Sequence, residues 1–181
     1  MEKRNNGDLL AVIDMQRVYL PEGAWATPGI LRAEQNILAL LQKYEDVIFT
    51  RHLSAENPVG TWARYNAAAL EVDKNPNNAR LIESLAAYEG ESLEKTTYSA
   101  FGSPDFSCRA QAAKRLILTG VQSEFCVLAT LLDAVDAGID VIYVADAVAG
   151  SATHLERAVE DIVRLMPAQA ALMATRELLE D

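Results

Sequence analysis

The sequence predicts an α/β fold, a three-layer doubly wound sandwich built around a six-stranded, mainly parallel sheet. Apolar runs typical of buried strands alternate along the chain with amphipathic stretches typical of helices, which is the pattern of βαβ units. The 181 residues are half hydrophobic, enough for one sizeable core, and no internal repeat divides them. We therefore expect a single domain that spans residues 1–181.

The predicted strands are short apolar runs, and the predicted helices carry apolar residues at helical spacing. Strands are expected at about residues 9–14, 46–51, 91–95, 115–119, 140–145 and 170–174. Helices are expected at residues 30–44, 79–88, 104–114, 124–137 and 153–165, with a short one from residue 175. The helix at 104–114 has a well-marked start, because Ser103 suits the N-cap and Pro104 suits the first helical position.

Residues 53–78 form the one long stretch without a regular pattern, and they include Pro58, Gly60 and Pro76. Irregular segments of this length in compact domains are usually functional or disordered. Trp62 favours packing over disorder, so we expect the segment to cap a pocket. Trp62 itself either stacks on a planar substrate or fills space in the core.

The composition excludes several classes of partner. The formal net charge is −10 and the basic residues are scattered, whereas binding to nucleic acid needs clustered Lys and Arg. No apolar run approaches the roughly 18 residues of a membrane span, and the polar start has no signal-like segment. We expect a cytoplasmic protein that acts on a small molecule. The two cysteines provide neither a disulfide framework nor zinc-ligand spacing, and Cys108 is interpreted as structural.

Cys126 stands where an apolar run stops and a helical pattern starts, in Leu116-Ile-Leu-Thr-Gly-Val-Gln-Ser-Glu-Phe-Cys126-Val. An isolated cysteine is more often core filler than a reactive group. At a helix N-terminus, however, free backbone N–H groups and the helix dipole favour a thiolate and bind an oxyanion. We therefore expect the Cys126 thiol to ionise below its free pKa and to alkylate faster than Cys108.

Two more apolar runs end at ionisable residues, Asp14 and Lys95. In an open parallel sheet the carboxyl ends of the strands meet at one edge, where ligands bind. Right-handed crossovers place the ends of the first, third and fourth strands there. Asp14, Lys95 and Cys126 should therefore converge. A carboxylate that accepts the thiol proton and a lysine that keeps the carboxylate charged would activate a nucleophilic cysteine.

At these residues the chain resembles the isochorismatase-like cysteine hydrolases, which include nicotinamidases and N-carbamoylsarcosine amidase. The resemblance spans nearly the whole chain. It rests on four motifs in order: Val12-Ile-Asp14-Met-Gln16, Lys95-Thr-Thr-Tyr98-Ser-Ala-Phe101, Gly120-Val-Gln-Ser-Glu-Phe-Cys126-Val and Val144-Ala-Asp146-Ala.

The resemblance implies several features of this chain. It implies the strand order 3-2-1-4-5-6, a catalytic triad of Asp14, Lys95 and Cys126, and a cis peptide bond before Gln122. It also implies an oxyanion hole formed by the backbone N–H groups of Gln122 and Cys126. Relatives are commonly dimers or tetramers, so a homo-oligomer is expected.

A metal ion is not expected. Nicotinamidases of this family carry an Asp-x-His pair after the second strand and a further His downstream. The matching stretch here is Thr50-Arg51-His52, and no His lies between His52 and His154. A lone imidazole does not supply the three or four ligands that a divalent ion requires. We expect neither a metal nor another cofactor, and we interpret His154 as structural.

Five residues are candidates for substrate binding: Gln16, Tyr19, His52, Trp62 and Tyr98. Gln16 and Tyr19 follow Asp14 on the loop that leaves the first strand, where they either reach the pocket or brace the loop. His52 bonds either to substrate or to backbone. Asp146 is expected to cap a helix or brace a loop rather than to react.

The leading hypothesis is a hydrolase that cleaves a C–N bond of a small amide or carbamoyl compound through a thioester. Vinyl-ether hydrolysis of isochorismate is the alternative within the family, although such enzymes typically lack the nucleophilic cysteine. An alternative from another class is a non-catalytic scaffold or ligand-binding module of the same fold.

Overall fold

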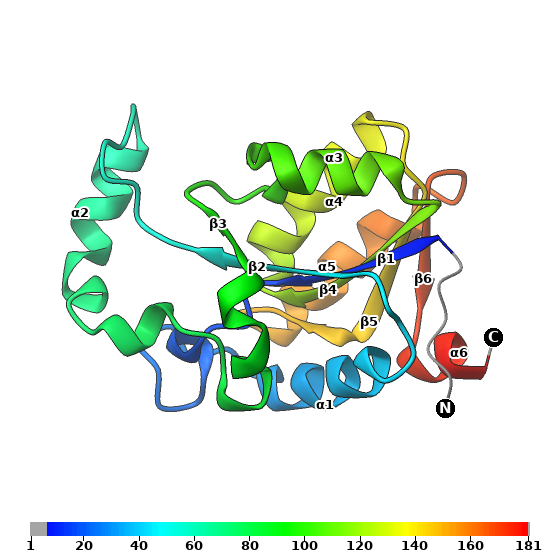
Figure 1. Ribbon diagram of the computed structural model, residues 1–181, viewed down its shortest axis with the longest axis horizontal. Coiled ribbons are helices and arrows are strands. Elements are labelled where there is room, and N and C mark those ends of the chain that lie inside the picture. Colours follow the sequence, from blue (N-terminus) through cyan, green and yellow to red (C-terminus); the bar gives the residue numbers. More distant parts are fainter. Residues whose placement is uncertain (1–6, 181) are drawn as a thin grey trace.

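The computed structural model describes residues 7–180, and it has a six-stranded sheet in the order β3-β2-β1-β4-β5-β6 (Figure 1). All five strand pairings are parallel, so the predicted architecture and strand order are confirmed. The strands are β1 (Asp8–Ile13), β2 (Val47–His52), β3 (Leu93–Lys95), β4 (Arg115–Val121), β5 (Val141–Ala149) and β6 (Ala170–Met173). Every residue of β1 is buried, as expected for the central strand.

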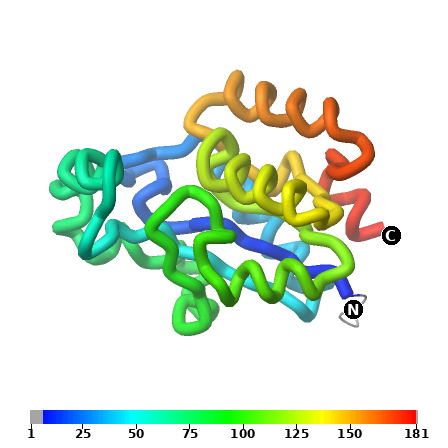
Figure 2. The backbone as a smooth tube through the Cα atoms, turned by 90° about the horizontal axis from the view of Figure 1, so that it is seen from above, coloured from blue at the N-terminus to red at the C-terminus, as the bar shows by residue number. Residues whose placement is uncertain are grey.

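Helices cover both faces of the sheet (Figures 1 and 2). One core cluster joins α1 (Ile30–Leu41) and α6 (Thr175–Glu180) to one face, and the other joins α3 (Pro104–Ala112), α4 (Leu128–Asp136) and α5 (Thr153–Arg164) to the opposite face. The 3-10 helices are η1 (Arg17–Tyr19), η2 (Pro76–Ala79), η3 (Glu83–Glu91) and η4 (Ala100–Gly102). Helix α3 starts as predicted, with the Ser103 hydroxyl accepting from the Phe106 N–H and Pro104 at the first position.

The expected irregular segment at residues 53–78 contains a helix, α2 (Trp62–Asp73). Proline and glycine mark that region as a loop in the sequence, but Pro58 and Gly60 precede the helix and Pro76 follows it. The intervening alanines and leucine are good helix formers. The prediction of an irregular segment was therefore wrong. Helix α2 lies at the end of the molecule where the strands end (Figures 1 and 2).

The helix predicted at residues 79–88 is also corrected, because the chain there forms the 3-10 helix η3 from Glu83. Its start is delayed by hydrogen bonds to the loop after β1. The Arg17 N–H donates to the Arg80 carbonyl at 2.8 Å, and the Ile82 N–H donates to the Met15 carbonyl at 3.0 Å. These contacts hold residues 80–82 extended and anchor the loop that follows Asp14.

Gly120 lets β4 approach β1 closely at the edge where the strands end. It pairs with Ile13 and has a φ of +109°. A Cβ atom at Gly120 would lie 2.1 Å from the Ile13 carbonyl oxygen. Asp14 directly follows Ile13, and Cys126 lies six residues after Gly120. The close contact between Ile13 and Gly120 therefore helps to bring Asp14 and Cys126 near each other.

Candidate active site

Asp14, Lys95 and Cys126 come together at the carboxyl edge of the sheet. Asp14 follows β1, Lys95 ends β3, and Cys126 lies in a short π-helix, η5 (Ser123–Val127), that follows β4. Lys95 Nζ lies 2.7 Å from Asp14 Oδ2, and both side chains are buried. The Cys126 thiol lies within hydrogen-bonding reach of both.

Lys95 is held by three acceptors. Besides pairing with Asp14, its ammonium group donates to the carbonyl oxygens of Thr97 at 3.0 Å and Tyr98 at 2.9 Å. Burial lowers the pKa of Lys95, but the neighbouring Asp14 and Cys126 outweigh burial and raise it above its ordinary value. Lys95 is therefore a fixed positive charge.

Asp14 has a backbone conformation that is uncommon for a residue with a side chain, with a φ of +49°. The Thr50 hydroxyl donates to Asp14 Oδ1 at 2.7 Å. Oδ2 pairs with the Lys95 ammonium group and has no hydrogen-bond partner among residues 7–180. The two carboxylate oxygens thus have separate partners.

Cys126 is 4% exposed. Burial and the Asp14 carboxylate raise the pKa of its thiol well above the ordinary value, and the opposing effect of Lys95 is smaller. The expectation of a thiol that ionises more readily than free cysteine is therefore wrong for the resting protein. Desolvation and the neighbouring carboxylate both disfavour a thiolate here.

The turn that opens η5 contains a cis peptide bond between Val121 and Gln122, as the resemblance implies. The backbone N–H groups of Gln122 and Cys126, the expected oxyanion-hole donors, belong to this turn and the helix that it opens. The Gln122 side chain donates to the Thr27 hydroxyl at 2.9 Å. This contact ties the turn to the loop after β1.

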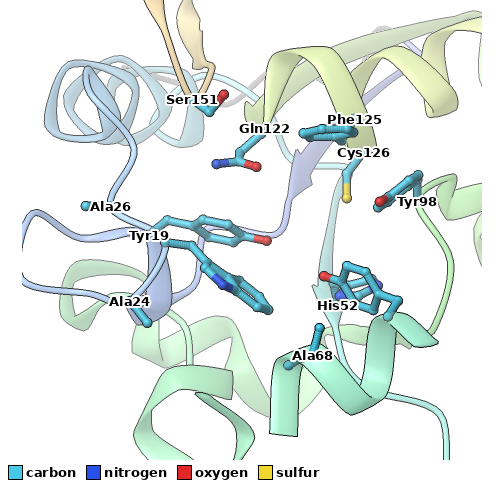
Figure 3. A pocket seen from close by; sticks show the side chains of 13 residues that line it. Tyr19, Ala24, Ala26, His52, Ala68, Tyr98, Gln122, Phe125, Cys126 and Ser151 are labelled. Atoms are coloured by element: carbon cyan, nitrogen blue, oxygen red, sulfur yellow. The ribbon is translucent and has the colours of Figure 1, made fainter. Parts of the chain in front are cut away.

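A cavity of about 630 Å³ opens beside Cys126, whose sulfur points into it (Figure 3). None of its lining side chains carries a formal charge, since burial keeps the His52 ring neutral. Four of them are Tyr or Trp, and one is Phe. The lining residues are Tyr19, Ala24, Trp25, Ala26, His52, Tyr65, Ala68, Ala69, Tyr98, Gln122, Phe125, Cys126 and Ser151.

Three of the five candidate binding residues line this cavity: Tyr19, His52 and Tyr98. Gln16 does not line the cavity, because its side-chain amide is hydrogen-bonded to the backbone of neighbouring segments. Its Nε2 donates to the His52 and Ala79 carbonyls at 3.1 Å each, and its Oε1 accepts from the His52 N–H at 2.8 Å. Trp62 is also outside the lining, and its ring packs against Tyr65 and Tyr98 with centroids 5.2 and 5.0 Å apart.

His52 presents a nearly buried imidazole to the cavity. It is 8% exposed, and Nε2 has no hydrogen-bond partner among the described residues. Burial lowers the pKa of His52, the Asp14 carboxylate opposes this with a smaller effect, and Lys95 lowers the pKa further, so the ring is neutral at pH 7. His154 is exposed and is not among the residues that line the cavity. Asp146 braces α6, since its carboxylate accepts from the Thr175 N–H and hydroxyl at 2.8 Å each.

Several lining residues were not predicted from the sequence. Trp25 lies in the loop after β1, Tyr65 in the unpredicted helix α2, and Ser151 after β5. Phe125 is the exception with a usable signal, because it directly precedes Cys126. The other three reach the cavity only through the tertiary fold.

The residues present do not fit a metal site of the nicotinamidase type. The Thr50 hydroxyl, at the position of the expected acidic ligand, is bonded to Asp14. Arg51 pairs with Glu94 at 2.9 Å. Across residues 7–180, no three His, Cys, Asp or Glu side chains form a group that could hold an ion. Within the same range, no helix has the length and apolar character to cross a membrane.

Comparison with known proteins matches residues 8–177 to the isochorismatase domain. The uncharacterized isochorismatase family protein YddQ of Bacillus subtilis (strain 168) is 27% identical over 154 residues, covering 81% of this chain and 80% of that protein. A cysteine hydrolase from Pseudomonas syringae pv. phaseolicola 1448A has a TM-score of 0.78 and 22% identity, covering 96% of this chain and 91% of that one. Nicotinamidase PncA from Bacillus subtilis has a TM-score of 0.73 and 21% identity, covering 92% and 99%. The two solved structures share the fold of this chain.

Proposed function

This chain belongs to the isochorismatase family of hydrolases, and we propose that it is a cysteine hydrolase that cleaves the C–N bond of a small, uncharged amide or carbamoyl compound. The observation that carries the proposal is the position of the Cys126 thiol, within reach of the Asp14–Lys95 ion pair and open to an uncharged cavity. Asp14, Lys95 and Cys126 are the proposed catalytic residues.

In the first half of the reaction, Cys126 Sγ attacks the carbonyl carbon while its proton passes to Asp14. Because burial keeps the resting thiol protonated, proton transfer accompanies attack rather than preceding it. The oxyanion accepts hydrogen bonds from the backbone N–H groups of Gln122 and Cys126. Asp14 then returns the proton to the leaving nitrogen, the C–N bond breaks, and a thioester remains on Cys126.

In the second half, a water molecule attacks the thioester while Asp14 accepts a proton from it. The C–S bond breaks, the proton returns to sulfur, and the acid product leaves. Lys95 stays protonated throughout, because its pKa is raised, and it remains paired with the Asp14 carboxylate between steps. No cofactor takes part in any of these steps.

The cavity favours an uncharged substrate. A substrate carboxylate needs a cation or several donors when it leaves water. None of the lining residues is cationic, and the Lys95 ammonium is already engaged by Asp14 and two backbone carbonyls. Isochorismate carries carboxylates, so this lining disfavours the vinyl-ether alternative. The aromatic side chains of Tyr19 and Tyr98 and the neutral ring of His52 are the proposed substrate-binding groups.

The test is a screen of small uncharged amides and carbamoyl compounds with ammonia release as the readout. Cys126→Ala is expected to lower turnover by a factor on the order of 10³ or more, and Lys95→Ala to remove most activity. Cys108→Ala, which removes the exposed thiol of α3, is the matched control and should retain activity. Turnover should survive exhaustive chelation.

A rapid-quench mass spectrum of the Cys108→Ala protein should show one acyl group attached during turnover. Ammonia release that persists in Cys126→Ala would contradict the proposal. Hydrolysis of isochorismate without amide turnover would favour the vinyl-ether alternative. Stoichiometric ligand binding with no turnover of either class would favour a non-catalytic module.

A further inference from the structure

Thr50 lies in strand β2 beside Asp14 and is 1% exposed. Its hydroxyl donates to Asp14 Oδ1 at 2.7 Å. The same hydroxyl oxygen accepts from the Asp14 backbone N–H at 3.3 Å, and the Thr50 carbonyl accepts from that N–H at 3.2 Å. One side chain thus contacts both the backbone and the carboxylate of Asp14, at the residue with the unusual φ of +49°.

This arrangement divides the carboxylate into two halves. Oδ1 is occupied by the hydroxyl of Thr50, whereas Oδ2 pairs with Lys95 and has no hydrogen-bond partner among the described residues, so Oδ2 is the oxygen that can accept a proton. Rotation about the bond to the carboxyl group would exchange the two oxygens, and the hydrogen bond from Thr50 opposes that rotation. A hydrogen bond donated to a carboxylate also stabilises its charged form, which is the form that accepts a proton.

We propose that Thr50 is a positioning residue, which holds Asp14 so that Oδ2 receives the proton of Cys126. The proposal rests on the proposed function for the direction of proton transfer. It assigns Thr50 no contact with substrate, and Thr50 is absent from the lining of the cavity. Its effect is therefore expected in the reactivity of Cys126 and not in the affinity for a ligand.

Other titratable groups also face Asp14, and a test must leave them in place. These groups are Lys95 of β3, Cys126 of η5, His52 of β2, Tyr19 of η1 and Tyr65 of α2. Thr50→Val keeps the branched shape at Cβ and removes only the hydroxyl, whereas Thr50→Ser keeps the hydroxyl. Comparing the two variants isolates the hydrogen bond to Asp14.

The experiment measures the rate at which 2-chloroacetamide, a small uncharged probe, alkylates Cys126 between pH 4 and pH 9. The mass of the intact protein is the readout, and all variants carry Cys108→Ala so that one thiol reports. Thr50→Val should slow alkylation about tenfold at pH 7, which corresponds to one hydrogen bond to a charged group. Thr50→Ser should stay within about twofold of the parent rate.

A double-mutant cycle separates positioning from a structural role. In an Asp14→Asn background, removing the Thr50 hydroxyl should have no further effect on the rate, whereas a merely structural Thr50 would slow alkylation in both backgrounds. Equal rates for parent and Thr50→Val, or equal losses in Thr50→Val and Thr50→Ser, would also overturn the proposal. Thermal unfolding checks that each variant is folded, and Thr50→Ala replaces Thr50→Val if the valine does not fit. Because the assay follows alkylation, it stands even if no amide is hydrolysed.

Discussion

At the scale of single residues, the protonation state of Cys126 is the feature with the largest consequence for chemistry. Burial and the Asp14 carboxylate raise the pKa of the thiol, and Lys95 offsets only part of that effect. A permanently ionised thiolate would react with any electrophile that reached it. A thiol that loses its proton only as it attacks reacts mainly with a substrate held in place, so burial here favours selectivity.

At pH 7.5, iodoacetate should label exposed Cys108 before Cys126, because Cys126 is buried and protonated and its cavity has no cation to attract the anionic reagent. Peptide mass spectrometry after timed quenching measures the two rates. The unfolded protein is the control, in which the two thiols should label at similar rates. Faster labelling of Cys126 in the folded protein would restore the sequence-based expectation of an activated thiolate.

At the scale of secondary-structure elements, the contact between β1 and β4 brings Asp14 and Cys126 together. Parallel pairing from Asp8 with Arg115 to Ile13 with Gly120 keeps the two strands in register up to the edge where they end. The absence of a side chain at Gly120 then lets the backbones approach. The relative position of Asp14 and Cys126 is therefore set by the buried pair of strands β1 and β4, which is more rigid than a loop.

The prediction at this scale is that Gly120→Ala destabilises the fold by about 3 kcal/mol or more, through both the clash with Ile13 and the positive φ. Gly138→Ala is the matched control, because Gly138 also has a positive φ, +75°, but nothing lies within 4 Å of its Cβ position. That change should cost about 1 kcal/mol. Urea unfolding followed by circular dichroism measures both. Equal losses in the two variants would show that the close approach of β4 to β1 is unimportant.

At the scale of the whole molecule, the interior carries several groups that resist ionisation. Burial raises the pKa of Tyr19, Tyr65, Tyr143 and Cys126. In the unfolded chain, cysteine ionises near pH 8.5 and tyrosine near pH 10. Above those values the unfolded state has released protons that the folded state still holds. The contribution of these four groups to the free energy of unfolding is therefore fully present below about pH 8.5, and it is lost as the pH rises further.

The prediction at this scale is a steep fall in the free energy of unfolding between pH 8.5 and pH 11. Each buried group contributes a slope of about 1.4 kcal/mol per pH unit once the pH exceeds its unfolded pKa. Urea titrations at a series of pH values measure the fall. Tyr143→Phe, which cannot ionise at this position, should show a smaller slope above pH 10 than the parent protein. Stability that stays level to pH 11, or identical slopes for both proteins, would contradict the burial of these groups.

The sequence alone determined the positions of the six strands, their parallel order through the family resemblance, and the convergence of Asp14, Lys95 and Cys126. It did so because hydrophobic periodicity is local, and because the carboxyl ends of parallel strands share one edge whatever the loops do. The family resemblance also implied the cis bond before Gln122. The sequence does not predict helix α2, because Pro58, Gly60 and Pro76, which lie just outside the helix, indicate an irregular segment.

Only the tertiary structure decided how the site is lined and which charges persist in it. Trp25 reaches the cavity from the loop after β1, and Tyr65 reaches it from helix α2. The Gln16 amide is hydrogen-bonded to the backbone of His52. The protonation state of the Cys126 thiol likewise depends on its burial from water and on its proximity to Asp14 and Lys95, which are far from it in the sequence. These properties arise from contacts between residues far apart in sequence and from desolvation, neither of which leaves a local pattern.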